Sequence, residues 1–192
     1  TLIVNNELVN KNILSGTFTS AKKNAIRAIL KGNNAEEYFD IQYLSPEYIC
    51  IRSVLSKNGL YHDSTIPQLN RFDDGRLSSD GVTRTINRHI AGYMNKPTSF
   101  KFLYDELRKP PYGLREGYLS LLLAFSFKPY LKGLTIISHE IEQEITAELF
   151  EEMIKRPDDF SIIITNWTQD QLKYLDAIEI LFSDYINKSV IY

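Results

Sequence analysis

A run of ten residues without charge, Tyr118 to Phe127, constrains the fold of this chain more than any other segment. It is about half as long as the roughly 20 apolar residues that a helix needs to cross a bilayer, so it predicts no membrane span. The segment predicts a helix from Leu114 to Phe127, which Pro129 stops. Because this helix is apolar on nearly every side, we expect it at the centre of the core.

Six further segments have the spacing of apolar residues that is typical of helices. The clearest start is at Ser45, where a capping serine precedes Pro46 at the first helical position and Glu47 in the first turn. For the first helix we expect Ser20 as the cap. The predicted helices are Thr17–Leu30, Ser45 to Gly59, Val82–Met94, Ser99–Arg108, Ala147–Lys155 and Gln169 to about Tyr185.

Two β-branched runs predict strands in the second half of the chain. Leu134–Ser138 is followed by the turn His139-Glu140 and by the alternating segment Ile141–Ile145, which together predict a β-hairpin. Ser161–Thr165 is a second β-branched run. Helix, turn, apolar helix and hairpin follow one another in the order of a winged helix. We therefore predict a mainly α (α+β) fold, with a helical N-terminal half and a winged-helix-like second half containing a small β-hairpin.

The 192 residues are enough for one large domain or two small ones. A segment rich in Asp, Asn, Ser, Gly and Pro, from Tyr61 to Gly81, is the best internal boundary. The predicted parts are a helical subdomain (1–62), a linker (63–81) and a winged-helix-like domain with a C-terminal helix (82–192). The first residues, Thr1-Leu2-Ile3-Val4, read like the middle of a chain, so we expect a piece of a longer protein.

Charge is unevenly distributed along the chain. The net charge of -2 argues against a surface built entirely for nucleic acid. However, residues 82–133 contain nine Lys or Arg and three Asp or Glu, whereas residues 134–192 contain four and twelve. Two interpretations remain open: an electropositive face for a partner, or basic and acidic blocks that neutralise each other within one fold.

Four cations are the candidate nucleic-acid-binding residues: Lys101, Arg108, Lys109 and Arg115. They alternate with aromatic residues around the turn that precedes the apolar helix, where a winged helix can place basic side chains against phosphates. The alternative is that these cations are solvated while Phe102, Leu103 and Leu107 belong to the core. Because winged helices also dock proteins, duplex DNA and protein partners both remain candidates.

No catalytic residue, metal ligand or cofactor site is predicted. The three histidines, His62, His89 and His139, lack the spacing of metal ligands, and Cys50 lies on the buried side of a helix. A phosphate-binding glycine loop is absent from the sequence. The acidic residues of the second half, together with Asp73, Asp74 and Asp80, fit solvated turns and faces. The alternatives to a binding module are a small metal-dependent nuclease, whose carboxylates assemble only in the fold, and a purely structural linker domain.

Several short motifs in this order resemble an internal region of large bacterial P-loop ATPases, similar to those of phage-defence operons of the BREX type. The most specific is Lys109-Pro110-Pro111-Tyr112-Gly113-Leu114-Arg115-Glu116-Gly117. The others are Asn6-Glu7-Leu8-Val9-Asn10, Leu14-Ser15, Ser45-Pro46-Glu47, Gly59-Leu60-Tyr61-His62 and Met153-Ile154-Lys155-Arg156-Pro157-Asp158-Asp159-Phe160. The resemblance extends to about residue 165 and carries over no ATP-binding residue.

The resemblance implies a module within a larger ATPase. We therefore expect a non-catalytic interaction module that docks protein partners or contacts DNA through the basic segment 82–133. The expected partners are other domains of the parent protein or duplex DNA, and not a membrane. The single cysteine and the lack of an export signal in the sequence favour a cytoplasmic protein.

Overall fold

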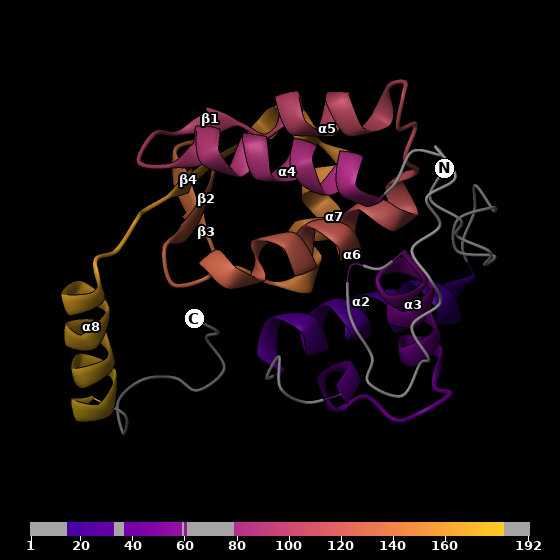
Figure 1. The fold of residues 1–192 in the computed structure, drawn as a ribbon, viewed down its shortest axis with the longest axis horizontal. Coiled ribbons are helices and arrows are strands. Elements are labelled where there is room, and N and C mark those ends of the chain that lie inside the picture. Colours follow the sequence, from indigo (N-terminus) through magenta and orange to yellow (C-terminus); the bar gives the residue numbers. More distant parts are fainter. Residues whose placement is uncertain (1–14, 33–36, 59, 61–78, 183–192) are drawn as a thin grey trace.

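The fold was analysed in a computed structural model that describes residues 15–32, 37–58, 60 and 79–182 (Figure 1). The longer helices are α2 (Gly16–Lys31), α3 (Pro46–Val54), α4 (Ser79–Tyr93), α5 (Lys101–Arg108), α6 (Glu116–Phe127), α7 (Ala147–Lys155) and α8 (Gln169–Leu181). Short 3-10 turns are η1 (Glu37–Asp40), η2 (Ser56–Asn58), η3 (Lys128–Tyr130) and η4 (Pro157–Asp159). The strands are β1 (Thr98–Ser99), β2 (Leu134–Ser138), β3 (Ile141–Gln143) and β4 (Phe160–Ile164). The mainly α (α+β) fold class is therefore confirmed.

The four strands form one antiparallel sheet in the order β1-β4-β2-β3. β2 and β3 form the predicted hairpin, in which Ser138 faces Ile141 across a two-residue turn. Both turn residues, His139 and Glu140, have positive φ, as a tight hairpin turn requires. The strand β1 was not predicted, because two residues are too few for a periodicity to be recognised.

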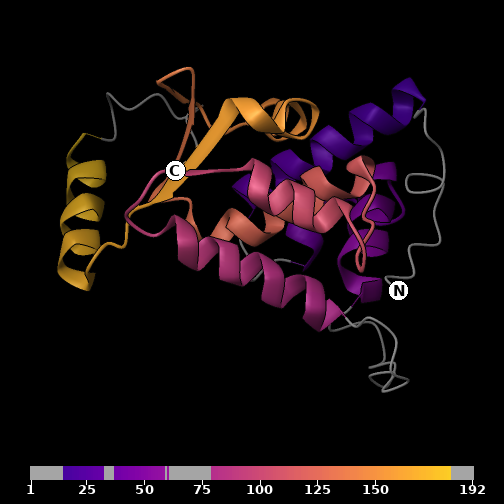
Figure 2. The same ribbon diagram turned by 90° about the horizontal axis from the view of Figure 1, so that it is seen from above.

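Helix α6 lies at the centre of the molecule, as its composition predicts (Figure 2). Eight of its twelve residues are buried. α2 and α3 pack against it from the N-terminal half, and α7 packs against it from the second half. The Tyr118 hydroxyl donates a hydrogen bond to the carbonyl of Val54 in α3, 3.3 Å away. The ammonium group of Lys128 donates to the carbonyls of Ile29 and Gly32 at the end of α2. One hydrophobic core thus joins the two halves.

Local sequence signals place most helix starts correctly. Ser45 caps α3 by accepting a hydrogen bond from the amide of Tyr48 at 3.1 Å, as predicted. Thr146 and Thr168 cap α7 and α8 in the same way. The prediction of Ser20 as the cap of the first helix is wrong: α2 begins at Gly16, and the Ser15 side chain accepts from the amide of Phe18.

From α4 to β4 the chain follows the order of a winged helix: helix, short strand, two helices, then antiparallel strands. It departs from the simple winged-helix pattern in the strands that follow α6. β3, α7 and η4 are inserted between β2 and β4, which pair side by side in the sheet. This insertion is what brings α7 against α2 and α6. The domain division at residue 62 remains a prediction, and residues 63–78 of the expected linker lie outside the described chain.

Helix α8 stands apart from the rest of the fold, at the left of Figure 1. The chain reaches it from β4 through residues 165–168, and a hydrogen bond of 3.0 Å from Trp167 Nε1 to the carbonyl of Lys132 holds this connection. An ion pair between Lys132 and Asp176 joins α8 itself to the start of β2. Within the part of the chain that the structure describes, none of the helices is both long and apolar enough to cross a bilayer.

Candidate interaction surface

Three of the predicted cations, Arg108, Lys109 and Arg115, lie at the turn between α5 and α6, whereas Lys101 lies at the start of α5. Acidic neighbours engage Lys101, Arg108 and Lys109. Lys101 forms an ion pair with Asp158 of η4, which raises the pKa of its ammonium group. Lys109 Nζ lies 3.1 Å from Asp105 Oδ2, one helical turn earlier. Much of the positive charge of the predicted site is therefore balanced within the fold.

Arg108 is held by several groups at once. Its Nη1 donates to the carbonyl of Leu114 at 3.0 Å, and its Nη2 lies 3.6 Å from a Glu116 carboxylate oxygen. The guanidinium carbon lies 5.9 Å from the centre of the Tyr104 ring. Arg115 is exposed at the start of α6, and no ion pair to it is found among the described residues. DNA contact by these four residues remains a prediction.

In the order of elements along the chain, helix α6 corresponds to the second helix of a helix-turn-helix, which can enter a DNA groove. A groove-reading helix exposes one face to the bases. Here α2, α3 and α7 pack around α6, and its residues Tyr118 to Ala124 are all buried. The face that would contact bases is therefore part of the hydrophobic core.

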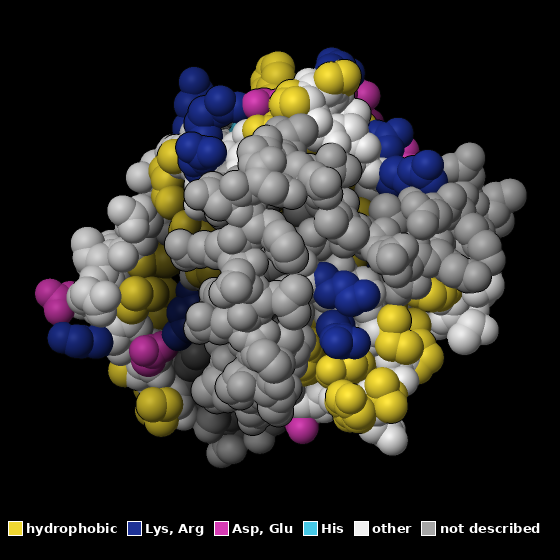
Figure 3. Space-filling model, turned by 45° about the vertical axis from the view of Figure 1, so that its right-hand side comes forward, with side chains coloured by type: hydrophobic (Ala, Val, Ile, Leu, Met, Phe, Trp, Pro, Cys, Tyr) yellow, Lys and Arg dark blue, Asp and Glu magenta, His cyan; other side chains and the backbone are white. Residues whose placement is uncertain are grey.

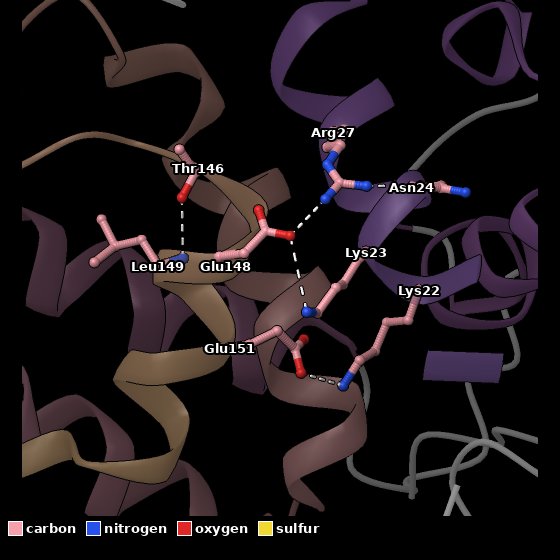
Figure 4. Close-up of polar contacts among 8 residues, drawn as sticks. All are labelled: Lys22, Lys23, Asn24, Arg27, Thr146, Glu148, Leu149 and Glu151. Carbon is pink, nitrogen blue, oxygen red and sulfur yellow. Dashed lines mark hydrogen bonds and ion pairs between the residues drawn. The ribbon is translucent and has the colours of Figure 1, made fainter. Parts of the chain in front are cut away.

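A row of ion pairs joins α2 to α7 (Figure 4). Lys22 Nζ lies 2.8 Å from Glu151 Oε2, and the two side chains are only 5% and 14% exposed. Beside this buried pair, Glu148 Oε1 lies 2.5 Å from Arg27 Nη2 and 3.8 Å from Lys23 Nζ at the surface. Part of the acidic block 134–192 is thus neutralised by the N-terminal helix, and part by Lys101 and Lys132 of the basic block.

A second polar cluster joins α4 to α5. His89 Nε2 lies 2.8 Å from Glu106 Oε2, and Arg88 pairs with the other oxygen of the same carboxylate. Hydrogen bonds from His89 and Arg88 hold the pKa of the Glu106 carboxyl below its usual value of 4.5. This arrangement uses the histidine to connect two helices rather than to activate a nucleophile.

The lowered pKa of Glu106 predicts a pH-dependent contribution to stability. Because the folded-state pKa lies below the unfolded one, the contribution is complete above about pH 4.5 and is lost as the pH falls through the folded-state value. Glu106→Gln is expected to lower the free energy of unfolding by about 1 kcal/mol or less near pH 6, and by less near pH 3. Urea denaturation at both pH values measures this. The exposed Glu142→Gln is the control; a constant difference for Glu106→Gln would contradict the assignment.

No ligand set for a metal-dependent reaction is found among the described residues. No group of three or more His, Cys, Asp or Glu side chains in the described residues lies close enough together to hold a metal ion. His62, Asp73 and Asp74 lie outside those residues, and His139 is in the turn of the β2–β3 hairpin. The nuclease alternative therefore has no observation to support it.

Cys50 is fully buried in α3, as the sequence predicts. Burial, aided by the charge of Glu47, raises the pKa of the thiol to about 12. Since only the thiolate reacts with alkylating agents, we expect native protein at pH 8 to resist iodoacetamide and unfolded protein to incorporate one equivalent. Mass spectrometry of the labelled protein distinguishes these results. Rapid labelling of native protein would show that this helix opens readily.

Exposed hydrophobic side chains provide the second candidate surface, which the predicted site did not include. Tyr174, Ile180 and Leu181 of α8 are 68%, 76% and 74% exposed. Smaller exposed groups lie before α3, at Tyr43 and Leu44, and on α5, at Phe102. Hydrophobic side chains also gather at the lower right of Figure 3, where the N-terminal helices lie. The expectation that Phe102 belongs to the core is wrong, whereas Leu103 and Leu107 are buried as expected.

One sequence signal could have found the α8 surface. Apolar residues in 172–182 recur on more of the helix circumference than one buried face needs.

Comparison of the chain with protein families, with characterised proteins and with solved structures finds no match. The functional argument therefore rests on the residues and their geometry.

Proposed function

We propose that this chain is a non-catalytic module that docks a protein partner. The observation that carries the proposal is α8, which stands clear of the core and exposes Tyr174, Ile180 and Leu181 to solvent. Apolar side chains with this exposure gain stability when a partner covers them. Following the resemblance of the sequence, we further propose that the module belongs to a larger cytoplasmic ATPase and docks its other domains.

Two observations favour protein docking over DNA contact. The helix that would enter a DNA groove is buried, and three of the four candidate phosphate-binding cations already pair with carboxylates. A phosphate would have to displace these partners, which removes much of the gain that counterion release gives to DNA binding. The basic segment 82–133 thus acts chiefly as a counter-charge inside the fold.

Fluorescence anisotropy of a labelled DNA duplex, at low and at moderate salt, tests this choice. We expect weak binding at low salt that disappears at moderate salt, and the same behaviour from the variant Arg108→Glu/Lys109→Glu. Tight binding that falls steeply with salt and is abolished in this variant would overturn the proposal in favour of DNA recognition. Glu142→Lys/Glu144→Lys is a matched control, because it changes the same amount of charge in the opposite direction at a different place.

A further inference from the structure

The exposed face of α8 is formed by residues from successive turns. Tyr174 and Leu181 lie seven positions apart and so point to the same side of the helix, with Ala177 between them and Ile180 beside them. The other apolar residues of the helix, Leu172, Leu175 and Ile178, are half-buried. We call Tyr174, Ala177, Ile180 and Leu181 the α8 face.

The surroundings of the α8 face are acidic. Helix α8 carries Asp170 and Asp176, which pair with Lys173 and Lys132. Glu140 and Glu142 in the β2–β3 hairpin and Glu144 just after it are exposed, and no ion pair engages them within the described residues. The three glutamates at the hairpin differ in this from the acids of α7 and η4, which are paired with cations of the same fold.

The hairpin and α8 lie at the same end of the molecule. Gln143 faces Ile136, so the chain at Glu144 has returned toward the start of β2. Lys132, just before that start, forms the ion pair with Asp176 of α8. Figures 1 and 2 both show the hairpin and α8 on the same side of the fold. An apolar strip and unpaired carboxylates therefore share one end.

From this arrangement, we propose that the α8 face binds a cationic amphipathic helix of another protein; this rests on the docking function proposed above. The apolar side of such a helix would cover Tyr174, Ile180 and Leu181, and its Lys or Arg residues would face Glu142 and Glu144. Helix against helix is a common mode of recognition for an apolar strip with this spacing. The charge argues against two other occupants: a second copy would bring like charges together, and a nucleic acid would be repelled.

The size of the surface sets the expected affinity. The 13 residues of α8 span about 20 Å, which is enough for three or four contacting turns. One helix pair of this length buries less than the roughly 1,200 Å² of a stable complex, so binding belongs to the transient class. We expect a Kd of the order of micromolar at low salt, rising with ionic strength as the ion pairs are screened.

Two labelled peptides with the same helical design test the proposal. Both carry leucine along one side, and the other side carries lysine in one peptide and glutamate in the other. We expect the fluorescence anisotropy of the lysine peptide to increase on titration with the full chain. The glutamate peptide should bind at least tenfold more weakly. Leu181→Gln and Ile180→Gln should each weaken the binding of the lysine peptide about tenfold or more. Glu142→Gln/Glu144→Gln should weaken it several-fold and reduce its salt dependence.

The controls distinguish binding at the α8 face from non-specific hydrophobic binding and from loss of binding through unfolding. Phe102→Gln removes an equally exposed apolar side chain on α5 and should leave peptide binding unchanged. Thermal unfolding followed by circular dichroism checks that each variant keeps its fold. Equal binding of the two peptides, or binding indifferent to Leu181→Gln and Ile180→Gln, would overturn the proposal. If sedimentation shows a dimer of the chain and Leu181→Gln dissociates it, the α8 face binds a second copy instead.

Failure of this inference is distinguishable from failure of the docking function. If neither peptide binds and duplex DNA does not bind either, only the cationic partner is wrong. If duplex DNA binds tightly and Arg108→Glu/Lys109→Glu abolishes that binding, the docking function itself is wrong.

Discussion

Replacing Lys22 by methionine is expected to lower the free energy of unfolding by about 3 kcal/mol or more. The reason is that Glu151 would keep a buried carboxylate without its cation. Lys22 Nζ lies 2.8 Å from Glu151 Oε2, and the two side chains are 5% and 14% exposed. The second oxygen, Glu151 Oε1, is buried and has no hydrogen-bond partner in the described residues. Urea denaturation followed by circular dichroism measures the change.

Two further variants separate burial from charge. The neighbouring Lys23 pairs with Glu148 at 3.8 Å at the surface, so Lys23→Met should cost less than about 1 kcal/mol. The double variant Lys22→Met/Glu151→Leu should recover most of the lost stability, because apolar side chains of similar size replace a buried pair at little cost. A double variant as unstable as Lys22→Met alone would show that packing, and not the unpaired charge, causes the loss.

The second large effect is expected at Gly133, where the start of β2 passes the end of β4. A Cβ atom at this position would lie 2.2 Å from the carbonyl oxygen of Thr165. The Gly133 carbonyl also accepts a hydrogen bond from the amide of Thr165 at 2.8 Å, so both backbones are held in place. Gly133→Ala should therefore lower the free energy of unfolding by about 3 kcal/mol.

Gly92 is the matched control for Gly133. It lies in α4, and a Cβ there would meet nothing within 4 Å. Gly92→Ala should raise the free energy of unfolding by about 0.5 kcal/mol, because alanine loses less conformational freedom in a helix than glycine. The two variants are thus expected to move the urea midpoint in opposite directions, and equal shifts would contradict the close approach at Gly133.

Sequence periodicity predicted most of the secondary structure, because helix caps and apolar spacing act over a few residues. The Val82, Ile86, Ile90 and Tyr93 stripe of α4 is buried as expected. Gly113, in the turn between α5 and α6, has a positive φ, which glycine adopts without strain. Local pattern failed where burial depends on distant neighbours: Ile49 fits the apolar stripe of α3 but is 41% exposed.

The candidate site shows the same limit. The sequence predicts the four cations as one site, but it does not reveal the partners of these side chains. Asp158 reaches Lys101 only because β4 pairs with β1 in the sheet and brings η4 beside α5. For the same reason, the buried Lys22–Glu151 pair could not be predicted: each residue looks like a solvated charge on an amphipathic helix.

The sequence by itself determined that α6 would be the centre of the fold, since a helix apolar on nearly every side is stable only when it is surrounded. It also determined the helix starts at Ser45, Thr146 and Thr168, where a side chain satisfies nearby backbone amides. Only the tertiary structure decided which charges remain unpaired and which apolar side chains stay exposed. Both depend on contacts between residues far apart in the chain, and no local spacing encodes them.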